Sequence, residues 1–170
     1  KETLELFERM YKGEDAVKEY CLRIRIPKSF WDKNSAMRDP VIFRMNKDTP
    51  HHRTGTKYKA YPTYDFACPI VDAKDGVTHA MRTTEYRLRD ELYHWMVKKL
   101  KLRHIYIQEF GRLNFNYTVV SKRKLRKLVE LEEVENWQDP RFPTVQGILR
   151  RGVQFDAMRK FILGQGFSTK

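Results

Sequence analysis

Apolar residues recur at helical spacing in several segments of the chain. Residues 2–11 carry this pattern and stop at Gly13, and a short helical turn is expected over 16–20. Thr83-Thr84-Glu85 combines an N-cap residue with an acidic first turn, and it predicts an amphipathic helix that runs to about Leu100. Three more helices are expected over 123–131, 144–151 and 156–163, the last one ended by Gly164.

Other segments predict strands. Residues 21–27 alternate apolar and basic side chains, and residues 40–45 and 105–110 are short apolar runs. The polar stretch 46–59 predicts a loop or hairpin, and residues 62–72 are typical of a buried element that faces a pocket. A helix, a strand and then a basic segment describe half of an α/β unit, whose ligand would sit beyond the carboxyl end of the strand.

The charge balance indicates a polyanionic partner. Lys and Arg number 34 against 22 Asp and Glu, which gives a net charge of +12 and a pI of about 9.7. Positive potential of this kind attracts nucleic acid, although a basic surface also serves solubility. With 170 residues, 41% hydrophobic and 33% charged, the chain has neither membrane-protein nor disordered composition.

Cysteine usage and the chain start add two expectations. Cys21 and Cys68 lie far apart and form no metal-binding spacing, so we expect reduced thiols, a cytoplasmic protein and no metal site. The sequence has no apolar run long enough to cross a membrane. It begins with Lys1 rather than Met, which favours a piece of a longer protein.

The segment Val120-Ser121-Lys122-Arg123-Lys124-Leu125 carries the strongest candidate chemistry. Three consecutive cations, opened by Ser and closed by Leu, make a poor core strand and suit the binding of polyphosphate on a loop. A solvated flank of a helix N-terminus is the alternative interpretation of the same residues.

Four motifs together resemble the glutamyl-tRNA synthetases of eukaryotes and archaea, with glutaminyl-tRNA synthetases as close cousins. The resemblance runs from about Cys21 to Gly166. The motifs are Arg53-Thr54-Gly55 with Tyr61-Pro62-Thr63-Tyr64-Asp65-Phe66; residues 76–86 (Gly76 to Tyr86); Arg112-Leu113-Asn114 with Val120-Ser121-Lys122-Arg123; and Trp137-Gln138-Asp139-Pro140-Arg141.

The resemblance implies an α/β fold: the second half of a class I synthetase nucleotide-binding, Rossmann-like domain. Residues 1–60 would be the end of an insertion that binds the acceptor stem, 61–125 the second catalytic half, and 126–170 a small helical domain. The first signature of the family, a His-x-Gly-His segment, does not occur in this sequence. We therefore expect these residues alone to make no adenylate.

The implied activity is the conversion of glutamate and ATP, with Mg²⁺, to glutamyl-adenylate and pyrophosphate, followed by transfer to the 3′ end of tRNA(Glu). A carboxylate is already an adequate nucleophile, so catalysis needs positioning and positive charge near the leaving pyrophosphate. Lys122 is the catalytic candidate. The implied ATP-binding residues are Arg112, Leu113, Val120, Ser121, Lys122 and Arg123.

Arg82 is the residue expected to select glutamate, because a guanidinium pairs with a carboxylate and is poorly paired by an amide. Glutaminyl enzymes lack this arginine and carry a Thr-His pair where this chain has Ala67-Cys68, whereas His51-His52 is more like the glutaminyl branch. The implied glutamate-binding residues are Tyr64, Arg82 and Cys68.

The implied RNA contacts are basic. Arg23, Arg25, Arg150 and Arg151 would hold tRNA phosphates, while Leu88 stands where relatives often have an acceptor-stem Asp. Other synthetases or a scaffold are left open as partners, and no membrane is expected. Two alternatives remain for the function: a glutaminyl-tRNA synthetase, or a non-catalytic RNA-binding module that kept a synthetase fold.

Overall fold

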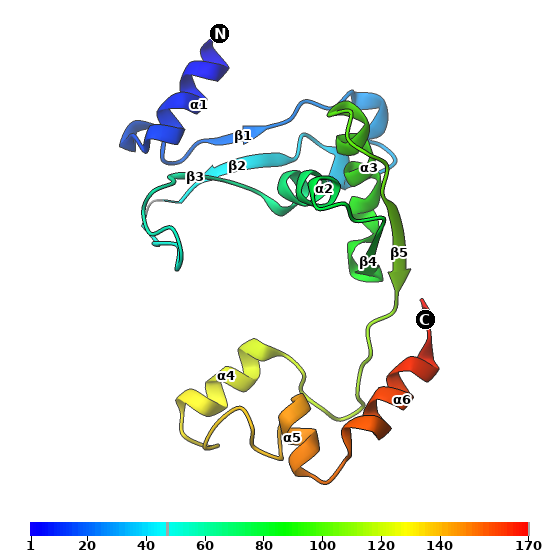
Figure 1. Cartoon of the computed structure of the whole chain (residues 1–170). Coiled ribbons are helices and arrows are strands. Elements are labelled where there is room, and N and C mark those ends of the chain that lie inside the picture. Colours follow the sequence, from blue (N-terminus) through cyan, green and yellow to red (C-terminus); the bar gives the residue numbers. More distant parts are fainter. Residues whose placement is uncertain (47, 170) are drawn as a thin grey trace. The chain divides into compact units, whose positions relative to one another are not determined.

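The computed structural model describes residues 1–46 and 48–169 of the chain. Its helices and strands form two compact units, residues 1–109 and residues 110–170, which are described separately (Figure 1). In the described residues, no helix is both long and apolar enough to span a membrane.

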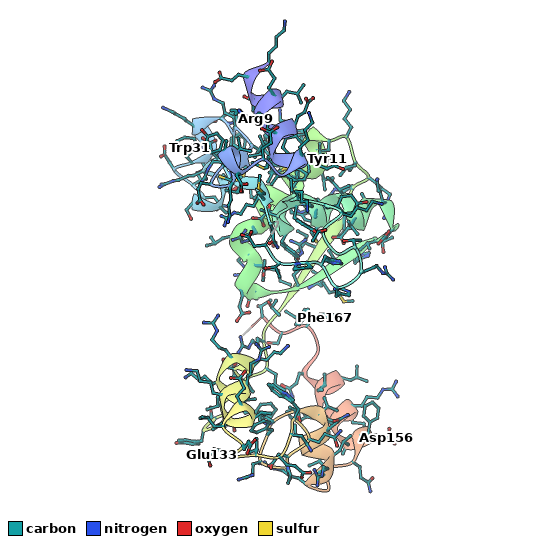
Figure 2. The ribbon with its side chains drawn as sticks, turned by 90° about the vertical axis from the view of Figure 1, so that its left-hand side faces the viewer. Arg9, Tyr11, Trp31, Glu133, Asp156 and Phe167 are labelled. Carbon is teal, nitrogen blue, oxygen red and sulfur yellow. The ribbon has the colours of Figure 1, made fainter. Side chains whose placement is uncertain are left out.

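The first unit opens with helix α1 (Glu2–Lys12), which ends as the sequence predicts. Gly13 adopts a left-handed conformation with φ of 83°, and its N–H donates to the carbonyls of Arg9 and Met10. Arg9, which is labelled in Figure 2, also forms an exposed ion pair with Glu14. The expected turn over 16–20 is a single 3₁₀ turn, η1 (Asp15–Val17).

A three-stranded antiparallel sheet follows. Its strands are β1 (Cys21–Arg23), β2 (Val41–Met45) and β3 (Ala60–Pro62), in the order β1-β2-β3, with short 3₁₀ turns η2 (Lys28–Phe30) and η3 (Ser35–Met37) between β1 and β2. Met10, Val17 and Ala60 join α1 to this sheet in a small core. The expected loop over 46–59 connects β2 to β3.

The first strand is shorter than the prediction of 21–27. The register shifts between Leu22 and Arg23, and the pairing with β2 ends at the Arg23–Val41 pair. Beyond that point the carboxylate of Asp39 replaces a backbone partner, because Asp39 Oδ1 accepts from the Ile26 N–H at 3.0 Å. The alternation of exposed basic and covered apolar side chains nevertheless continues to Ile26, which is fully buried.

The second half of this unit is helix α2 (Tyr64–Lys74), strand β4 (His79–Thr83), 3₁₀ helix η4 (Thr84–Arg89), helix α3 (Asp90–Lys99) and strand β5 (Tyr106–Phe110). Strands β4 and β5 pair in a two-stranded sheet. Leu92 and Met96 of α3 pack against Ile26, Met37 and Ile42, so α3 shares its core with the antiparallel sheet.

The predicted helix from Thr84 to Leu100 is correct in extent but not in type. Its first six residues form a 3₁₀ helix, and α-helical geometry begins only at Asp90. Thr83 occupies the N-cap position without making a side-chain capping bond. The tighter 3₁₀ turn changes which side chains of this segment share a face.

The second unit is helical. It contains α4 (Lys122–Glu130), α5 (Val145–Arg150) and α6 (Phe155–Gln165), close to the three predicted ranges. Gly164 does not end the last helix, which continues to Gln165 and stops at Gly166, where φ is 59°. Leu125, Val134 and Phe142 form the buried core of this unit, with Trp137 packed against it.

The protein therefore has mixed α/β content, as predicted. Its two compact units do not coincide with the three ranges 1–60, 61–125 and 126–170: the antiparallel sheet shares a core with α3, and residue 125 lies inside α4. The functional division into an insertion, a catalytic half and a helical domain stays a prediction.

Candidate functional site

The residues singled out from the sequence fall into two groups. Tyr64, Cys68 and Arg82 lie in the first unit and come together there, while the candidate nucleotide-binding residues lie in the second unit. Each group is described by itself.

One face of α2 builds the first group. Tyr64, Cys68 and Asp72 are spaced by four residues, so they stack along the same side of the helix. The Cys68 thiol donates to Asp72 Oδ2 at 3.4 Å. Burial is the main cause that raises the pKa of Cys68, which keeps the thiol protonated as a donor at neutral pH.

Arg82 of β4 points at this face. Its side chain is only 8% exposed, and its Nη2 donates to Cys68 Sγ at 3.3 Å. Two carboxylates lie slightly farther away: Asp72 Oδ2 is 3.9 Å from Nη2, and Asp90 Oδ1 is 3.9 Å from Nη1. These distances exceed hydrogen-bond length, so the two anions compensate the charge without occupying the N–H donors.

Two aromatic rings flank the guanidinium. Its carbon lies 4.2 Å from the centre of the Tyr93 ring and 5.7 Å from that of Tyr64. Tyr93 is buried, whereas Tyr64 is 51% exposed and contacts the ring of Tyr86. The group is thus closed by Tyr93, and Tyr64 forms its solvent-exposed edge. Loss of hydration and a hydrogen bond to Cys68 raise the pKa of Tyr64 to about 12, so its hydroxyl remains neutral.

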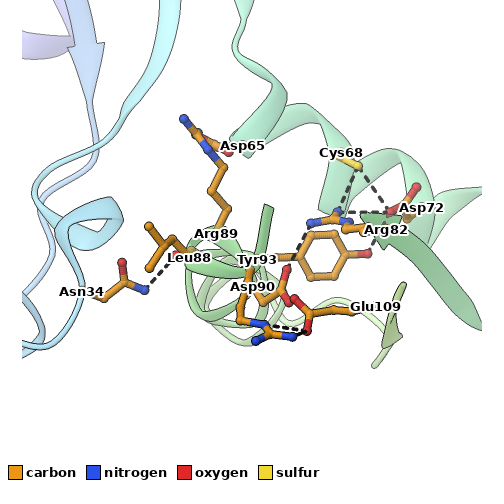
Figure 3. A network of polar contacts seen from close by, with 11 residues as sticks. Asn34, Asp65, Cys68, Asp72, Arg82, Leu88, Arg89, Asp90, Tyr93 and Glu109 are labelled. Carbon is orange, nitrogen blue, oxygen red and sulfur yellow. Dashed lines mark hydrogen bonds and ion pairs between the residues drawn. The ribbon is translucent and has the colours of Figure 1, made fainter. Parts of the chain in front are cut away.

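The carboxylates of Asp72, Asp90 and Glu109 form an acidic frame around Arg82 (Figure 3). Asp72 Oδ2 also accepts a hydrogen bond from the Tyr93 hydroxyl at 2.9 Å, and burial raises the pKa of Tyr93. The carboxyl groups of Asp90 and Glu109 face each other, and Arg87 holds Glu109 through contacts of 2.8 and 2.7 Å. Nearby, Arg89 pairs with Asp65.

Sequence reasoning did not find this frame. Asp72, Asp90, Tyr93 and Glu109 come from two helices and a strand, and only folding brings them to Arg82. One signal was available for Asp72: had residues 64–74 been recognised as a helix, its spacing from Tyr64 and Cys68 would have placed it on their face.

In the second unit, Ser121 is the N-cap of α4 and Lys122 is its first helical residue. The loop expected at this position is instead the start of a helix, because the N–H groups of Lys124 and Leu125 already bond to the Ser121 carbonyl at 3.0 Å. The Ser121 hydroxyl makes no capping bond, and the side chains of Ser121, Lys122 and Arg123 are exposed. The apolar side of the helix is anchored by buried Leu125.

The preceding segment, residues 111–120, has no helix or strand and contains a turn at residues 116–117. Arg112 and Leu113 follow β5, and Val120 directly precedes the N-cap. Leu113 lines an apolar hollow together with Ile148 of α5 and Phe161 of α6. Its side chain therefore has a packing environment, while its part in binding adenine stays a prediction.

The candidate RNA-binding arginines have different surroundings. Arg25 is exposed, and Arg23 donates to the Asp39 carbonyl at 3.0 Å. In the second unit, Arg150 donates to the Gln138 carbonyl at 3.3 Å and Arg151 donates to the Pro140 carbonyl. Both of these side chains therefore hold the turn formed by residues 137–141.

That turn is the motif Trp137 to Arg141. Asp139 accepts from the Arg141 backbone N–H at 2.8 Å and from its guanidinium at 2.9 and 2.8 Å. The hydrogen bonds from Arg141 lower the pKa of Asp139 to about 2. The turn is thus an ordered support for α5.

No metal centre is evident in the part of the chain that the structure describes, since no three side chains of His, Cys, Asp or Glu gather there in a way that would hold an ion.

The whole of residues 1–170 matches the sequence model of the family described as tRNA synthetases class I (E and Q), catalytic domain. The chain belongs to this family. Its resemblance to synthetases is thereby confirmed, and its mixed α/β fold is that of part of a class I synthetase catalytic domain.

Individual synthetases are also similar. The chain is 56% identical over 165 residues to the probable cytoplasmic glutamate–tRNA ligase of Schizosaccharomyces pombe, covering 97% of this chain and 23% of that protein. It is 51% identical to the cytoplasmic glutamate–tRNA ligase of Saccharomyces cerevisiae (97% and 23%), and 53% identical to the bifunctional glutamate/proline–tRNA ligase of Drosophila melanogaster (98% and 10%). The chain spans about a quarter or less of the length of these relatives.

Proposed function

We propose that this chain is part of a cytoplasmic glutamate–tRNA ligase, which activates glutamate with ATP and transfers it to the 3′ end of tRNA(Glu). The observation that carries the proposal is the buried guanidinium of Arg82, whose N–H donors are largely unused and which lies beside the half-exposed ring of Tyr64. The relatives whose names specify glutamate, with 51% and 56% identity, support the same assignment over the glutaminyl alternative.

Arg82 suits the side-chain carboxylate of glutamate. A guanidinium that is buried against Tyr93 and has only a thiol as its hydrogen-bond partner among the described residues gains strongly from a bidentate carboxylate. Glutamine would present a neutral amide, whose N–H₂ group cannot pair with the guanidinium. We assign Tyr64 to the open side of the same pocket, with its neutral hydroxyl available to the substrate, and Cys68 to the orientation of Arg82.

The N-terminus of α4 suits the phosphates of ATP, which enters as its magnesium complex. An α-carboxylate oxygen of glutamate attacks the α-phosphorus of ATP. The bond between the α-phosphorus and the oxygen that bridges to the β-phosphorus breaks, and pyrophosphate leaves with the electron pair of that bond. Lys122 would stabilise that charge, and Ser121 and Arg123 would bind phosphate oxygens, because the first helical turn offers a free hydroxyl, N–H groups and exposed cations. The adenosine part of ATP would bind against Arg112, Leu113 and Val120.

The remaining assignments concern the rest of the parent enzyme. We assign residues 1–60 to the end of the acceptor-stem insertion, 61–125 to the second half of the nucleotide-binding fold, and 126–170 to the following helical domain. Arg23 and Arg25, with Arg150 and Arg151, would contact tRNA phosphates, in keeping with the net charge of +12. Because Arg150 and Arg151 also hold the 137–141 turn, their replacement should affect stability as well as RNA binding.

Amino-acid-dependent pyrophosphate exchange by the full-length parent tests the function. We expect glutamate to support exchange and glutamine to fail. Arg82→Cys should reduce kcat/KM for glutamate by about 10²- to 10³-fold, since a buried charge pair loses one partner. Arg9→Ala, which removes only an exposed ion pair of α1, serves as the control and should leave exchange unchanged.

Other outcomes would contradict the proposal. Exchange with glutamine alone would identify the glutaminyl enzyme, and an unchanged glutamate dependence of Arg82→Cys would remove Arg82 from the substrate site. A parent that binds tRNA but activates no amino acid would be a non-catalytic RNA-binding module.

A further inference from the structure

Two buried carboxylate oxygens next to Arg82 have no hydrogen-bond donor among the described residues. They are Oδ1 of Asp90, at the start of α3, and Oε1 of Glu109, in β5. The two carboxyl groups face each other (Figure 3). Buried acceptors without donors are costly, so the pair is a site at which a proton can be taken up.

The surroundings decide which carboxyl receives that proton. Arg87 donates to Glu109 at 2.8 Å, and this hydrogen bond lowers the pKa of Glu109. Burial, followed by the charge of Glu109, raises the pKa of Asp90. Adjacent carboxylates of this kind titrate as a pair, and a proton that enters this pair is held on Asp90 and donated to Glu109.

Arg82, more than Arg87, opposes protonation of Asp90. Its guanidinium lies 3.9 Å from Asp90 Oδ1 and favours the charged form of that carboxyl. A ligand carboxylate bound to Arg82 would compete for this cation and add a negative charge nearby. Both effects favour the protonated form of Asp90.

The other charged and titratable groups around Asp90 already have partners. Asp72 on α2 accepts from Tyr93 and Cys68, Arg89 of η4 pairs with Asp65, and Arg87 pairs with Glu109. Asp90 is therefore the carboxyl of this frame that lacks a donor while contacting Arg82.

We propose that Asp90 is a positioning residue which exchanges its ion pair with Arg82 for a proton shared with Glu109 when a substrate carboxylate binds Arg82. The proton comes from solvent and none passes to the substrate. The inference rests on the proposed role of Arg82 in binding glutamate. Glutamate binding is then coupled to the uptake of a proton. Arg82 pairs with the substrate carboxylate, and its charge is no longer compensated by Asp90.

The sign of the pH dependence follows from linkage. The glutamate-bound form binds more protons than the free form, so affinity for glutamate rises as pH falls and weakens as Asp90 loses its proton. The limit for one coupled proton is about a tenfold change in Kd per pH unit. The interval from about pH 6 to about pH 8 avoids titration of the carboxyls and amino group of free glutamate.

Calorimetry of glutamate binding to the full-length parent tests the proposal, performed at each pH in two buffers of different ionisation enthalpy. The difference between the two heats measures proton uptake directly. We expect net uptake with the wild-type protein, and none with Asp90→Asn, whose amide can donate to Glu109 without a solvent proton. Glu91→Gln, at the neighbouring exposed position of α3, is the matched control and should keep the uptake.

Pyrophosphate exchange adds a second measurement, the pH dependence of the KM for glutamate. A purely structural role of Asp90 would not change this pH dependence. Asp90→Asn should make the KM for glutamate independent of pH while kcat changes by less than about twofold. Binding of glutamate by the wild type without proton uptake would overturn the proposal. So would a tenfold weaker binding by Asp90→Asn at every pH, which would show that Asp90 acts as an anion.

Failure of the proposed function gives a different result, because a parent that binds no glutamate at any pH contradicts the assignment of Arg82 itself. If Asp90→Asn does not fold, the two-buffer measurement on the wild-type protein still decides whether a proton is taken up.

Discussion

Tyr93 contacts Arg82 directly and also holds its counter-ion: the Arg82 guanidinium lies 4.2 Å from the centre of the Tyr93 ring. The Tyr93 hydroxyl donates a hydrogen bond to Asp72, the carboxylate beside the same guanidinium. The ring face supports the cation while the hydroxyl holds its counter-ion. One buried side chain of α3 thus orients both Arg82 and Asp72.

The two contacts can be separated by substitution. Tyr93→Phe keeps the ring over Arg82 and removes the 2.9 Å hydrogen bond to Asp72, so we expect a loss of about 1–2 kcal/mol in the free energy of unfolding. Tyr93→Leu should cost at least about 1 kcal/mol more, because it also removes a desolvated cation–π contact. Urea unfolding of both variants measures the difference. Equal stability of the two variants would show that the ring contact contributes nothing.

Lys122 should act on the chemical step. In the full-length parent, Lys122→Ala is expected to lower kcat for pyrophosphate exchange by about 10²- to 10³-fold, because it removes a cation from the developing charge on pyrophosphate. The KM for glutamate should hardly change, because the charge that Lys122 would stabilise develops only in the transition state. Lys127→Ala, an exposed cation in the last turn of the same helix, is the control and should retain activity. Full activity of Lys122→Ala would favour a non-catalytic module.

Gly147 should be intolerant of any side chain. A Cβ atom there would lie 2.4 Å from the Phe142 carbonyl oxygen and 2.7 Å from that of Asp139, so the first turn of α5 packs directly on the backbone of the preceding turn. We expect Gly147→Ala to destabilise the protein by about 1–3 kcal/mol in denaturant unfolding.

The control for that experiment is Gly164→Ala in α6, where a Cβ atom would meet no atom within 4 Å. This substitution should be neutral or stabilising by up to about 1 kcal/mol, because alanine favours the helix more than glycine. Equal destabilisation by both substitutions would argue against a close backbone approach at Gly147.

Asp139 should make the 137–141 turn sensitive to acid. Its pKa of about 2 in the folded chain lies below the value of about 3.9 in an unfolded chain. The folded state therefore binds fewer protons, and the stabilisation is present above about pH 4 and is lost as pH falls toward 2. Stability measured across this interval should fall less steeply in Asp139→Asn than in the wild type. Arg141→Ala, which removes the donors, should flatten the curve in the same way; an unchanged slope in both variants would contradict the assignment.

The local elements were largely predictable because their causes are local. The apolar spacing of residues 2–11 and the glycine at 13 determine where α1 begins and ends, and Thr144 caps α5 through a bond to the Gly147 N–H. Predictions failed where a tertiary contact competed with the pattern. The Asp39 carboxylate replaced a strand partner for Ile26, and the phosphate-binding loop expected at Lys122 proved to be the first turn of a helix anchored by Leu125.

The sequence by itself determined the family, the candidate residues Arg82 and Lys122, and the basic character of the chain, because these depend on residue type and order. Only the tertiary structure decided that Asp72, Asp90, Tyr93 and Glu109 converge on Arg82. Their positions follow from the packing of α2, α3 and β5 around one buried cation. Burial and charge pairing between distant segments depend on that packing, and no local spacing encodes them.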